Sequence, residues 1–322
     1  MKKILLDLSE CKAIGDNLSS TPTIRKLFES YSRKITLVTH FPELFQNNPH
    51  VEKTYFPNTI NFDHIKDTYI IHRTFDVLGN KSERGVENKH SRMDIRQYHA
   101  VSLGFMLSSD EMECDYYPSE YEPIDNLPEK YVLIHPVQNW ANRTWSSKNW
   151  MLLTKRLNEL GISVVSIGKD SSETGFFNID KPTFNFEIEN GLNLVNKTSL
   201  SQAWHVIDRS MCLVTMDTGL LHLAGTTDSQ ILLLGSAINP EFRKPYRNGS
   251  QDYKLSYVLG GCDLHCASNM KYNVKEWGTI QGVPPIIGCL ENKKTFECHP
   301  SVEKVLEKIL DKIKTFVNLK EE

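Results

Sequence analysis

The stretch from residue 213 to residue 225 constrains the fold of this chain most. Residues 213–216 are mostly apolar and predict a buried strand, Asp217, Thr218 and Gly219 predict a tight polar turn, and residues 220–225 predict a helix. In such a unit Asp217 is expected to cap the helix, and Gly219 lets the backbone approach a ligand closely. The N–H groups of the first helical turn then form an anion site, commonly used for phosphate, unless the turn only caps a core helix.

Length and composition predict a globular protein of two domains. The chain has 322 residues, 39% hydrophobic and 24% charged, which is typical of soluble proteins with domains of roughly 150 residues. A net charge of -3 and the lack of a dense Lys and Arg run argue against nucleic acid as a partner. The apolar run from Ile4 to Leu6 is too short for a signal peptide or a transmembrane segment. We therefore expect a cytoplasmic protein, with peripheral attachment to the inner membrane as an alternative.

Both halves of the chain alternate short apolar runs with amphipathic stretches, which predicts parallel sheets covered by helices. In the first half, strands are expected at 3–8, 34–39, 51–55 and 68–72, and helices at 19–28, 41–45 and 90–106, with loops at 9–16 and 80–88. In the second half, strands are expected at 131–136, 162–168, 192–195 and 230–235, and helices at 150–161, 199–207 and 302–317.

Residues 114–130 separate the two halves. They carry prolines and acidic residues, which is typical of an interdomain linker. We therefore expect an α/β chain with two Rossmann-like, doubly wound domains at 1–125 and 126–300, followed by an amphipathic packing helix at 301–322. Open sheets of this kind bind ligands beyond the carboxyl ends of their strands, so the expected site is a cleft between the two domains.

Several segments, taken in their order, resemble the glycosyltransferases of family 9, the heptosyltransferase type. Residues 13–18 and 21–25 are similar to that family's opening segment. His135 and Pro136, followed by residues 143–145 and Trp150, resemble its second segment. Residues 214–224 are similar to its Asp-Thr-Gly signature, and residues 235–240 lie where the family has a further loop pattern. The resemblance covers nearly the whole chain.

This resemblance implies a GT-B architecture, in which the C-terminal domain holds a nucleoside diphosphate sugar and the N-terminal domain holds the acceptor. The acceptor is a glycan, a lipid-linked molecule or a protein. Asp16 is implied as the base that activates the acceptor hydroxyl, with helix capping as its alternative role. Inverting transfer without a catalytic metal is expected, because positive charge and hydrogen-bond donors stabilise the leaving diphosphate. The expected donor-binding residues are Arg143, Gly168, Asp217, Thr218, Gly219 and His222, of which His222 has a core role as its alternative.

Two departures from the family pattern bear on the donor. Residues 235–240 read Gly-Ser-Ala-Ile-Asn-Pro, and Asn193 stands where some heptose-transferring members have a ribose-binding acid. Both changes weaken an assignment of ADP-heptose, so the base and the sugar of the donor stay open.

Cysteines are few, but four of the seven lie in the last quarter of the chain. Cys262 and Cys266 form one pair, and Cys289 and Cys298 a wider one. Four thiolates suit a structural zinc or iron site, and some relatives of the family carry a cysteine cluster in the corresponding place. Four reduced, partly buried thiols without metal are the alternative. Cys11, Cys114 and Cys212 are isolated and are expected to be inert.

Two other classes of function share the expected fold. A nicotinamide-dependent oxidoreductase is disfavoured because the first strand and helix lack the G-x-G-x-x-G pattern and offer only Gly15. A catalytically silent sugar-binding or nucleotide-binding protein would share every feature except a working base. Loss of transfer in an Asp16→Asn variant separates the enzyme from the silent protein.

Overall fold

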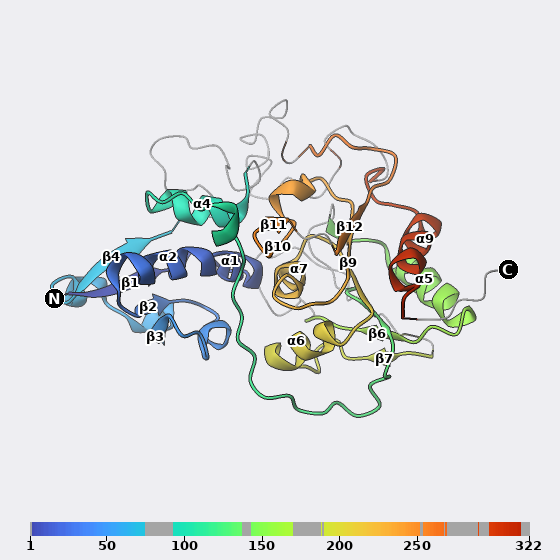
Figure 1. The fold of residues 1–322 in the computed structure, drawn as a ribbon, viewed down its shortest axis with the longest axis horizontal. Helices are drawn as coiled ribbons and strands as arrows, with labels where there is room; N and C mark the ends of the chain where they lie inside the picture. The colour runs from blue at the N-terminus through green and yellow to red at the C-terminus, as the bar shows by residue number, and fades with distance from the viewer. Residues whose placement is uncertain are drawn as a thin grey trace. The chain divides into compact units, whose positions relative to one another are not determined.

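The computed structural model describes residues 2–74, 93–136, 143–169, 188, 190–251, 254–266, 268, 289 and 296–316. The chain divides into two compact units, Met1–Ser119 with Glu241–Asp252, and Glu120–Pro240 with Tyr253–Glu322. Figure 1 shows the two sheets and their helices. The segment Glu241–Asp252 belongs to the first unit, although parts of the second unit precede and follow it along the chain. The α/β fold with two parallel sheets is the one that the sequence predicts.

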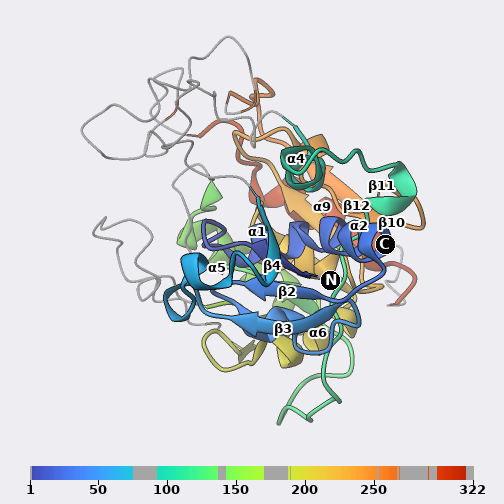
Figure 2. The same cartoon turned by 90° about the vertical axis from the view of Figure 1, so that its left-hand side faces the viewer.

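The first unit contains a four-stranded parallel sheet of order β3-β2-β1-β4. The inner strands β1 (Lys3–Asp7) and β2 (Ile35–Val38) are apolar and almost wholly buried, as expected for strands covered on both faces. The edge strands β3 (Val51–Tyr55) and β4 (Tyr69–Arg73) are partly exposed. Figure 2 shows β2 and β3 side by side. The four predicted strands of this half are confirmed.

Short helices follow the strands of the first unit. These are α1 (Ile14–Ser19), α2 (Thr21–Tyr31), η1 (Pro42–Phe45), η2 (Pro57–Thr59), α3 (Phe62–Ile65), α4 (Ile95–Ser102) and η4 (Ser109–Glu111). The predicted loop at 9–16 is too long, because α1 already begins at Ile14. The predicted helix at 90–106 is shorter, because the Asp94 side chain caps it and Gly104 at φ 83° follows its end. The predicted loop at 80–88 lies outside the described residues.

The second unit contains a six-stranded parallel sheet of order β12-β9-β8-β5-β6-β7. Its strands are β5 (Val132–Ile134), β6 (Val164–Ser166), β7 (Leu192–Asn193), β8 (Cys212–Thr215), β9 (Ile231–Leu234) and β12 (Leu255–Val258). The strand β12 was not predicted. Its helices are α5 (Ser147–Glu159), α6 (Leu200–Asp208), α7 (Gly219–Ala224) and α9 (Val302–Ile313). Helix α6 begins with a capping box, which Ser199 and Gln202 form.

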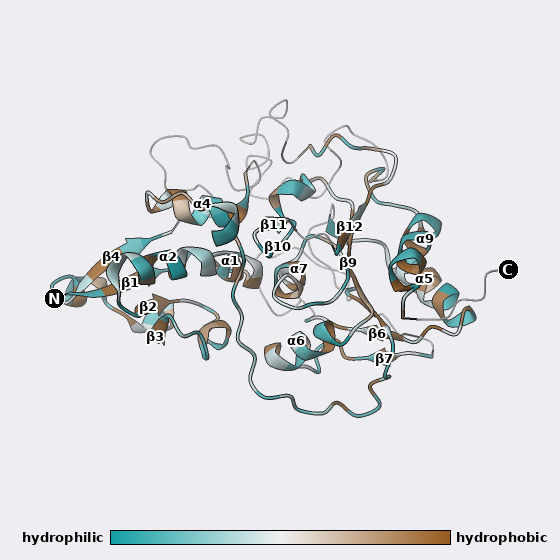
Figure 3. Cartoon of the chain, viewed as in Figure 1, coloured by the Kyte–Doolittle hydropathy of each residue, from teal (hydrophilic) through white to brown (hydrophobic). Residues whose placement is uncertain are grey.

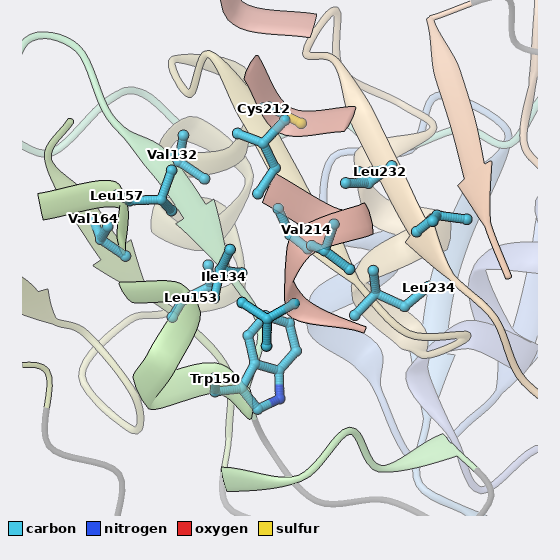
Figure 4. Close-up of a cluster of buried hydrophobic side chains, with 14 of the residues drawn as sticks. Val132, Ile134, Trp150, Leu153, Leu157, Val164, Cys212, Val214, Leu232 and Leu234 are labelled. Carbon is cyan, nitrogen blue, oxygen red and sulfur yellow. The ribbon is translucent and has the colours of Figure 1, made fainter. Parts of the chain in front are cut away.

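The core of the second unit lies between its sheet and the helix pair α5 and α9, which lie side by side (Figure 1). Helix α9 buries Val302, Val305, Ile309 and Ile313, which confirms the predicted packing face. Trp150 from α5 points into the cluster that holds Val214 and Leu234 (Figure 4). Figure 3 shows brown, apolar strands and helices that carry both colours.

Glu241–Asp252 packs within the first unit through a small antiparallel hairpin. The turn η7 (Pro240–Phe242) leads into β10 (Tyr246–Arg247), which pairs with β11 (Ser250–Gln251). The buried guanidinium of Arg96 on α4 donates to the Lys244 carbonyl over 2.7 Å and lies 4.8 Å from the centre of the Tyr246 ring. The hairpin is therefore fastened to α4.

Within the part of the chain that the structure describes, no helix is both long enough and apolar enough to cross a membrane.

Candidate functional site

The turn after β8 is held by Arg143, which follows β5. The Arg143 Nη1 atom lies 3.2 Å from the Asp217 carboxylate Oδ2 and donates to the Asp217 carbonyl over 3.1 Å. Only 15% of the Arg143 side chain and 5% of the Asp217 side chain are exposed, so water screens this ion pair weakly. The two residues that the sequence places in the donor site are thus in contact.

The predicted role of Asp217 as the cap of α7 is wrong. Thr218 is the capping residue, with extended backbone, and its side chain makes no capping hydrogen bond. The physical reason is competition, because the Asp217 carboxylate is taken by the guanidinium of Arg143.

The Thr218 hydroxyl belongs to a buried polar cluster with His135 and Thr215. The His135 Nδ1 atom lies 3.1 Å from the Thr215 hydroxyl oxygen and 3.1 Å from the Thr218 hydroxyl oxygen. Burial lowers the pKa of His135 to about 3, so the ring is neutral at physiological pH. Sequence reasoning used His135 only as part of a motif and missed these contacts; its place after an apolar strand was the available signal.

Helix α7 is shorter than a strong anion site requires. It has six residues, and the Leu221 N–H already donates to the Thr218 carbonyl over 3.1 Å. A dipole of so few peptides is small, so the positive charge at this turn comes mainly from the Arg143 side chain. Gly219 begins the helix, and His222 is buried in its last turn. The burial of His222 fits the core role as well as a role near the ligand.

Gly168 and Asn193 lie at the ends of the neighbouring strands β6 and β7. Gly168 has φ 139°, and its carbonyl accepts from the Asn196 N–H over 2.8 Å. The Asn193 side-chain oxygen accepts from the Ser166 hydroxyl over 2.9 Å and from the Val195 N–H over 3.0 Å. These bonds shape the end of the sheet formed by β6 and the edge strand β7.

Asp16 lies in the first unit, whereas the other predicted binding residues lie in the second. It is half-buried in the first turn of α1, and its alternative role as helix cap is excluded because Ala13 is the capping residue. The buried Asn17 fixes this turn: its side-chain nitrogen donates to the Cys11 carbonyl over 2.6 Å, and its oxygen accepts from the Thr39 hydroxyl over 2.8 Å. Asn17 was missed by sequence reasoning.

A second carboxylate, Asp7, ends β1 and was also missed. It is 7% exposed, accepts from the Ser9 N–H over 3.0 Å and pairs with Arg73 Nε over 3.2 Å. The sequence signal that could have identified Asp7 is an acidic residue at the end of an apolar strand. The pairing with Arg73 offsets the negative charge of Asp7, which makes Asp7 a poor base.

The four late cysteines are free thiols, each partly buried. Backbone hydrogen bonds bring two of them together: Gly260 N–H donates to the Cys298 carbonyl over 2.9 Å, and Cys262 N–H to the Glu297 carbonyl over 3.2 Å. Gly260 is required there, because an added Cβ would lie 2.1 Å from the Glu297 carbonyl oxygen. Burial, and then the charges of Cys266, Cys262 and Cys289, raise the pKa of Cys298 to about 12.

The donor set of these cysteines suits a soft metal such as zinc or iron. Among the described residues, however, no three His, Cys, Asp or Glu side chains converge as metal ligands do. The thiols are neighbours that would have to turn toward one another to bind an ion.

Comparison with solved structures identifies the fold. Iron-containing dodecameric TibC from enterotoxigenic E. coli H10407 is 14% identical with a TM-score of 0.69, over 98% of this chain and 80% of that chain. E. coli ADP-heptose lipopolysaccharide heptosyltransferase II is 15% identical with a TM-score of 0.60, over 98% and 99%. The family 9 glycosyl transferase from Veillonella parvula DSM 2008 is 13% identical with a TM-score of 0.60, over 98% and 98%. The fold is therefore that of the GT-B glycosyltransferases.

The family model described as glycosyltransferase family 9 (heptosyltransferase) matches residues 65–257. This match spans more than half of the chain, so the chain belongs to glycosyltransferase family 9 and is a glycosyltransferase, as its sequence motifs indicate. A comparison with curated protein sequences gave no match.

Proposed function

We propose that this glycosyltransferase moves a sugar from a nucleoside diphosphate sugar to an acceptor hydroxyl in one inverting displacement. The observation that carries the proposal is the group of Arg143, Asp217, Thr218 and His135 at the carboxyl ends of β5 and β8, in a family 9 chain. Carboxyl ends of parallel strands are where such sheets bind nucleotides. A structure of TibC holds ADP-D-β-D-heptose, which supports a nucleoside diphosphate heptose as one donor to test.

In this proposal the second unit holds the donor. Arg143 supplies the positive charge, and the Thr218 hydroxyl and turn N–H groups supply donors to the leaving diphosphate. Gly168, Asp217, Gly219 and His222 surround that site. Because Arg143 neutralises developing charge, the transfer step proceeds without a divalent ion. The resemblance to a lipopolysaccharide heptosyltransferase supports glycan or lipopolysaccharide synthesis as the setting, with a glycan, lipid-linked or protein acceptor.

The first unit holds the acceptor, and Asp16 is the base. Inversion in one step requires a carboxylate that takes the acceptor proton on the face opposite the leaving group. Asp16 is half-buried in a turn whose backbone is fixed by the side chain of Asn17. The capping position of α1 is occupied by Ala13 and not by Asp16.

The proposal is tested by two measurements. ADP, UDP and GDP should each be screened by thermal shift, since a ligand that binds only the native state raises the melting temperature. Asp16→Asn keeps the size of the side chain but cannot accept a proton, so we expect normal donor binding and a loss of roughly 100-fold or more in turnover. The exposed Asp67→Asn variant is the matched control and should keep full turnover.

A fall in donor affinity in step with turnover in Asp16→Asn would assign Asp16 to the fold instead of to the chemistry. Transfer that EDTA abolishes and that Mg²⁺, rather than zinc or iron, restores would overturn the metal-free part of the proposal. No stabilisation by any nucleoside diphosphate would overturn the donor class.

A further inference from the structure

We propose that His135 is a positioning residue of the donor site, whose Nδ1–H group orients the Thr218 hydroxyl so that its proton faces a phosphoryl oxygen. This inference rests on the proposed function, because it gives the nucleoside diphosphate a specific hydrogen-bond donor. It goes beyond it by assigning a role to a histidine that need not touch the ligand.

The cluster is compact and shielded from water. His135, Thr215 and Thr218 are 6%, 0% and 8% exposed. The His135 Nδ1 atom lies 3.1 Å from each threonine hydroxyl, and the two hydroxyl oxygens lie 3.3 Å apart. All three side chains belong to the second unit, from the ends of β5 and β8 and the turn after β8. Hydrogen bonds in such a buried group have little competition from solvent.

The direction of these bonds follows from the single proton of Thr215. The Thr215 hydroxyl donates that proton to the Met216 carbonyl over 3.0 Å. It can therefore only accept from His135, which requires that Nδ1 carries the hydrogen. Because the ring is neutral, Nε2 then has none. The same Nδ1–H reaches the Thr218 oxygen, so Thr218 keeps its own proton for another acceptor.

The direction of the hydrogen bond between His135 and Thr218 decides whether the Thr218 hydroxyl can donate to a phosphate. Phosphoryl oxygens only accept hydrogen bonds. A Thr218 hydroxyl that donated to His135 would present lone pairs to them, whereas one that accepts from His135 presents its proton. The 3.3 Å contact with the Thr215 oxygen is long for an O–H···O bond, so a phosphoryl oxygen can replace it.

The start of α7 gives independent evidence that the Thr218 hydroxyl is not used to cap the helix. Threonine at the capping position of a helix usually accepts a hydrogen bond from an N–H of the first turn. Thr218 occupies this position in α7, yet its side chain makes no such bond and lies against His135 instead. The histidine contact thus replaces the ordinary local one.

The test uses two replacements of the ring that differ in where they place a donor. Asn puts an amide nitrogen near the position of Nδ1, and Gln puts it near that of Nε2. Affinity for ADP, UDP and GDP is measured by calorimetry on the full chain, with unfolding free energies in parallel. We expect His135→Asn to stay within about threefold of the parent affinity and His135→Gln to lose roughly tenfold, as for one lost hydrogen bond.

Thr218 variants show whether His135 acts through Thr218. Thr218→Ser keeps the hydroxyl and should bind like the parent, whereas Thr218→Val should lose affinity as His135→Gln does. The double variant that combines His135→Gln with Thr218→Val should lose no more than the worse single variant, because both changes remove one interaction. Equal affinity of His135→Asn and His135→Gln, or additive losses, would overturn the inference while leaving the proposed function intact.

A measurement without nucleotide tests the same inference a second time. The ring ¹⁵N chemical shifts of His135, assigned by comparison with His135→Asn, report which nitrogen carries the hydrogen. A protonated Nδ1 supports the inference, and a protonated Nε2 overturns it. Failure of the parent chain to bind any of the three nucleotides would instead remove the proposed function, and this inference with it.

Discussion

Arg143 and Asp217 form an ion pair that also fixes the turn after β8. Since both side chains are largely buried, loss of one leaves the other charge without its partner, at a cost that can exceed the value of the pair itself. Any variant of Arg143 therefore changes both the stability of the turn and the charge available to a phosphate. The two effects have to be measured separately.

Arg143→Ala should weaken nucleoside diphosphate binding and slow transfer, because a charge-assisted contact is worth on the order of 1.5 to 3 kcal/mol. Calorimetry with ADP, UDP and GDP checks the affinity. The control Arg156→Ala removes an arginine whose side chain is 57% exposed and should leave binding unchanged. Adding Asp217→Asn relieves the unpaired carboxylate, so a defect in ligand binding that persists in the double variant belongs to the lost guanidinium. Unchanged affinity in Arg143→Ala would return Arg143 to a purely structural role.

His135 should make stability fall in acid. Its pKa is about 3 in the native protein, by burial, and about 6.5 in the unfolded chain. Below about pH 6.5 the unfolded chain therefore binds a proton that the native state does not, which favours unfolding by up to about 1.4 kcal/mol per pH unit until about pH 3.

The unfolding free energy of the parent chain minus that of His135→Asn isolates this effect, because the carboxylates contribute equally to both. Urea titrations between about pH 7 and about pH 5 should show the difference shrinking as pH falls. A difference that is constant with pH would contradict a neutral, buried His135.

Helices and strands with a strong apolar period are predicted well from this sequence. The packing face of α9 and the inner strands β1 and β2 follow from burial, which a repeating apolar pattern reports directly. The start of α1 and the cap of α7 were mispredicted. The cap of α7 depends on which partner the Asp217 side chain selects, and that partner is Arg143, far away in sequence. Side-chain competition of this kind leaves no local pattern.

The predicted structural metal site lies at the late cysteines, in and near the segments around Gly260 and Cys298. We propose that Cys262, Cys266, Cys289 and Cys298 bind one structural zinc or iron ion. Cysteine thiols have to lose their protons on binding, and burial raises the pKa of the Cys298 thiol, so uptake should release acid and strengthen as pH rises. Elemental analysis of protein purified without a metal-affinity tag should find close to one ion per chain.

Cys289→Ser should lose that ion and some stability, whereas the control Cys114→Ser, at an isolated cysteine, should keep the ion. A metal-free chain that is as stable as the cysteine variant would leave four plain thiols as the correct description.

At the scale of the whole molecule, the sequence predicts the two α/β halves but not the route of the chain between them. The alternation of strands and helices is a local signal, and both sheets follow from it. The assignment of Glu241–Asp252 to the first unit depends on contacts with α4, which lies far away in sequence. The positions of His135 and Asn17 were likewise hidden, because their partners lie on other strands and turns.

Arg96 should be the most sensitive residue of this arrangement. Its side chain is fully buried, pairs with Asp94 through Nε over 2.8 Å and donates to the Lys244 carbonyl. Arg96→Met leaves the Asp94 carboxylate without its charge partner and should cost about 3 to 5 kcal/mol of unfolding free energy, measured in urea. Adding Asp94→Asn should recover part of that loss. The exposed control Lys34→Met should change little, and an equally small effect in Arg96→Met would show that the hairpin is not fastened through this residue.

The membership of Glu241–Asp252 in the first unit has a consequence for exchanging parts between relatives. A chimera joined at the linker, with one protein's first 119 residues and another's remainder, would set the α4 of one parent against the hairpin of the other. The Gly249 N–H, which donates to the Glu113 side chain over 2.9 Å, would face a foreign partner as well. A transplant of the first unit into or out of this chain therefore needs two pieces, the N-terminal block up to Ser119 and the hairpin segment Glu241–Asp252.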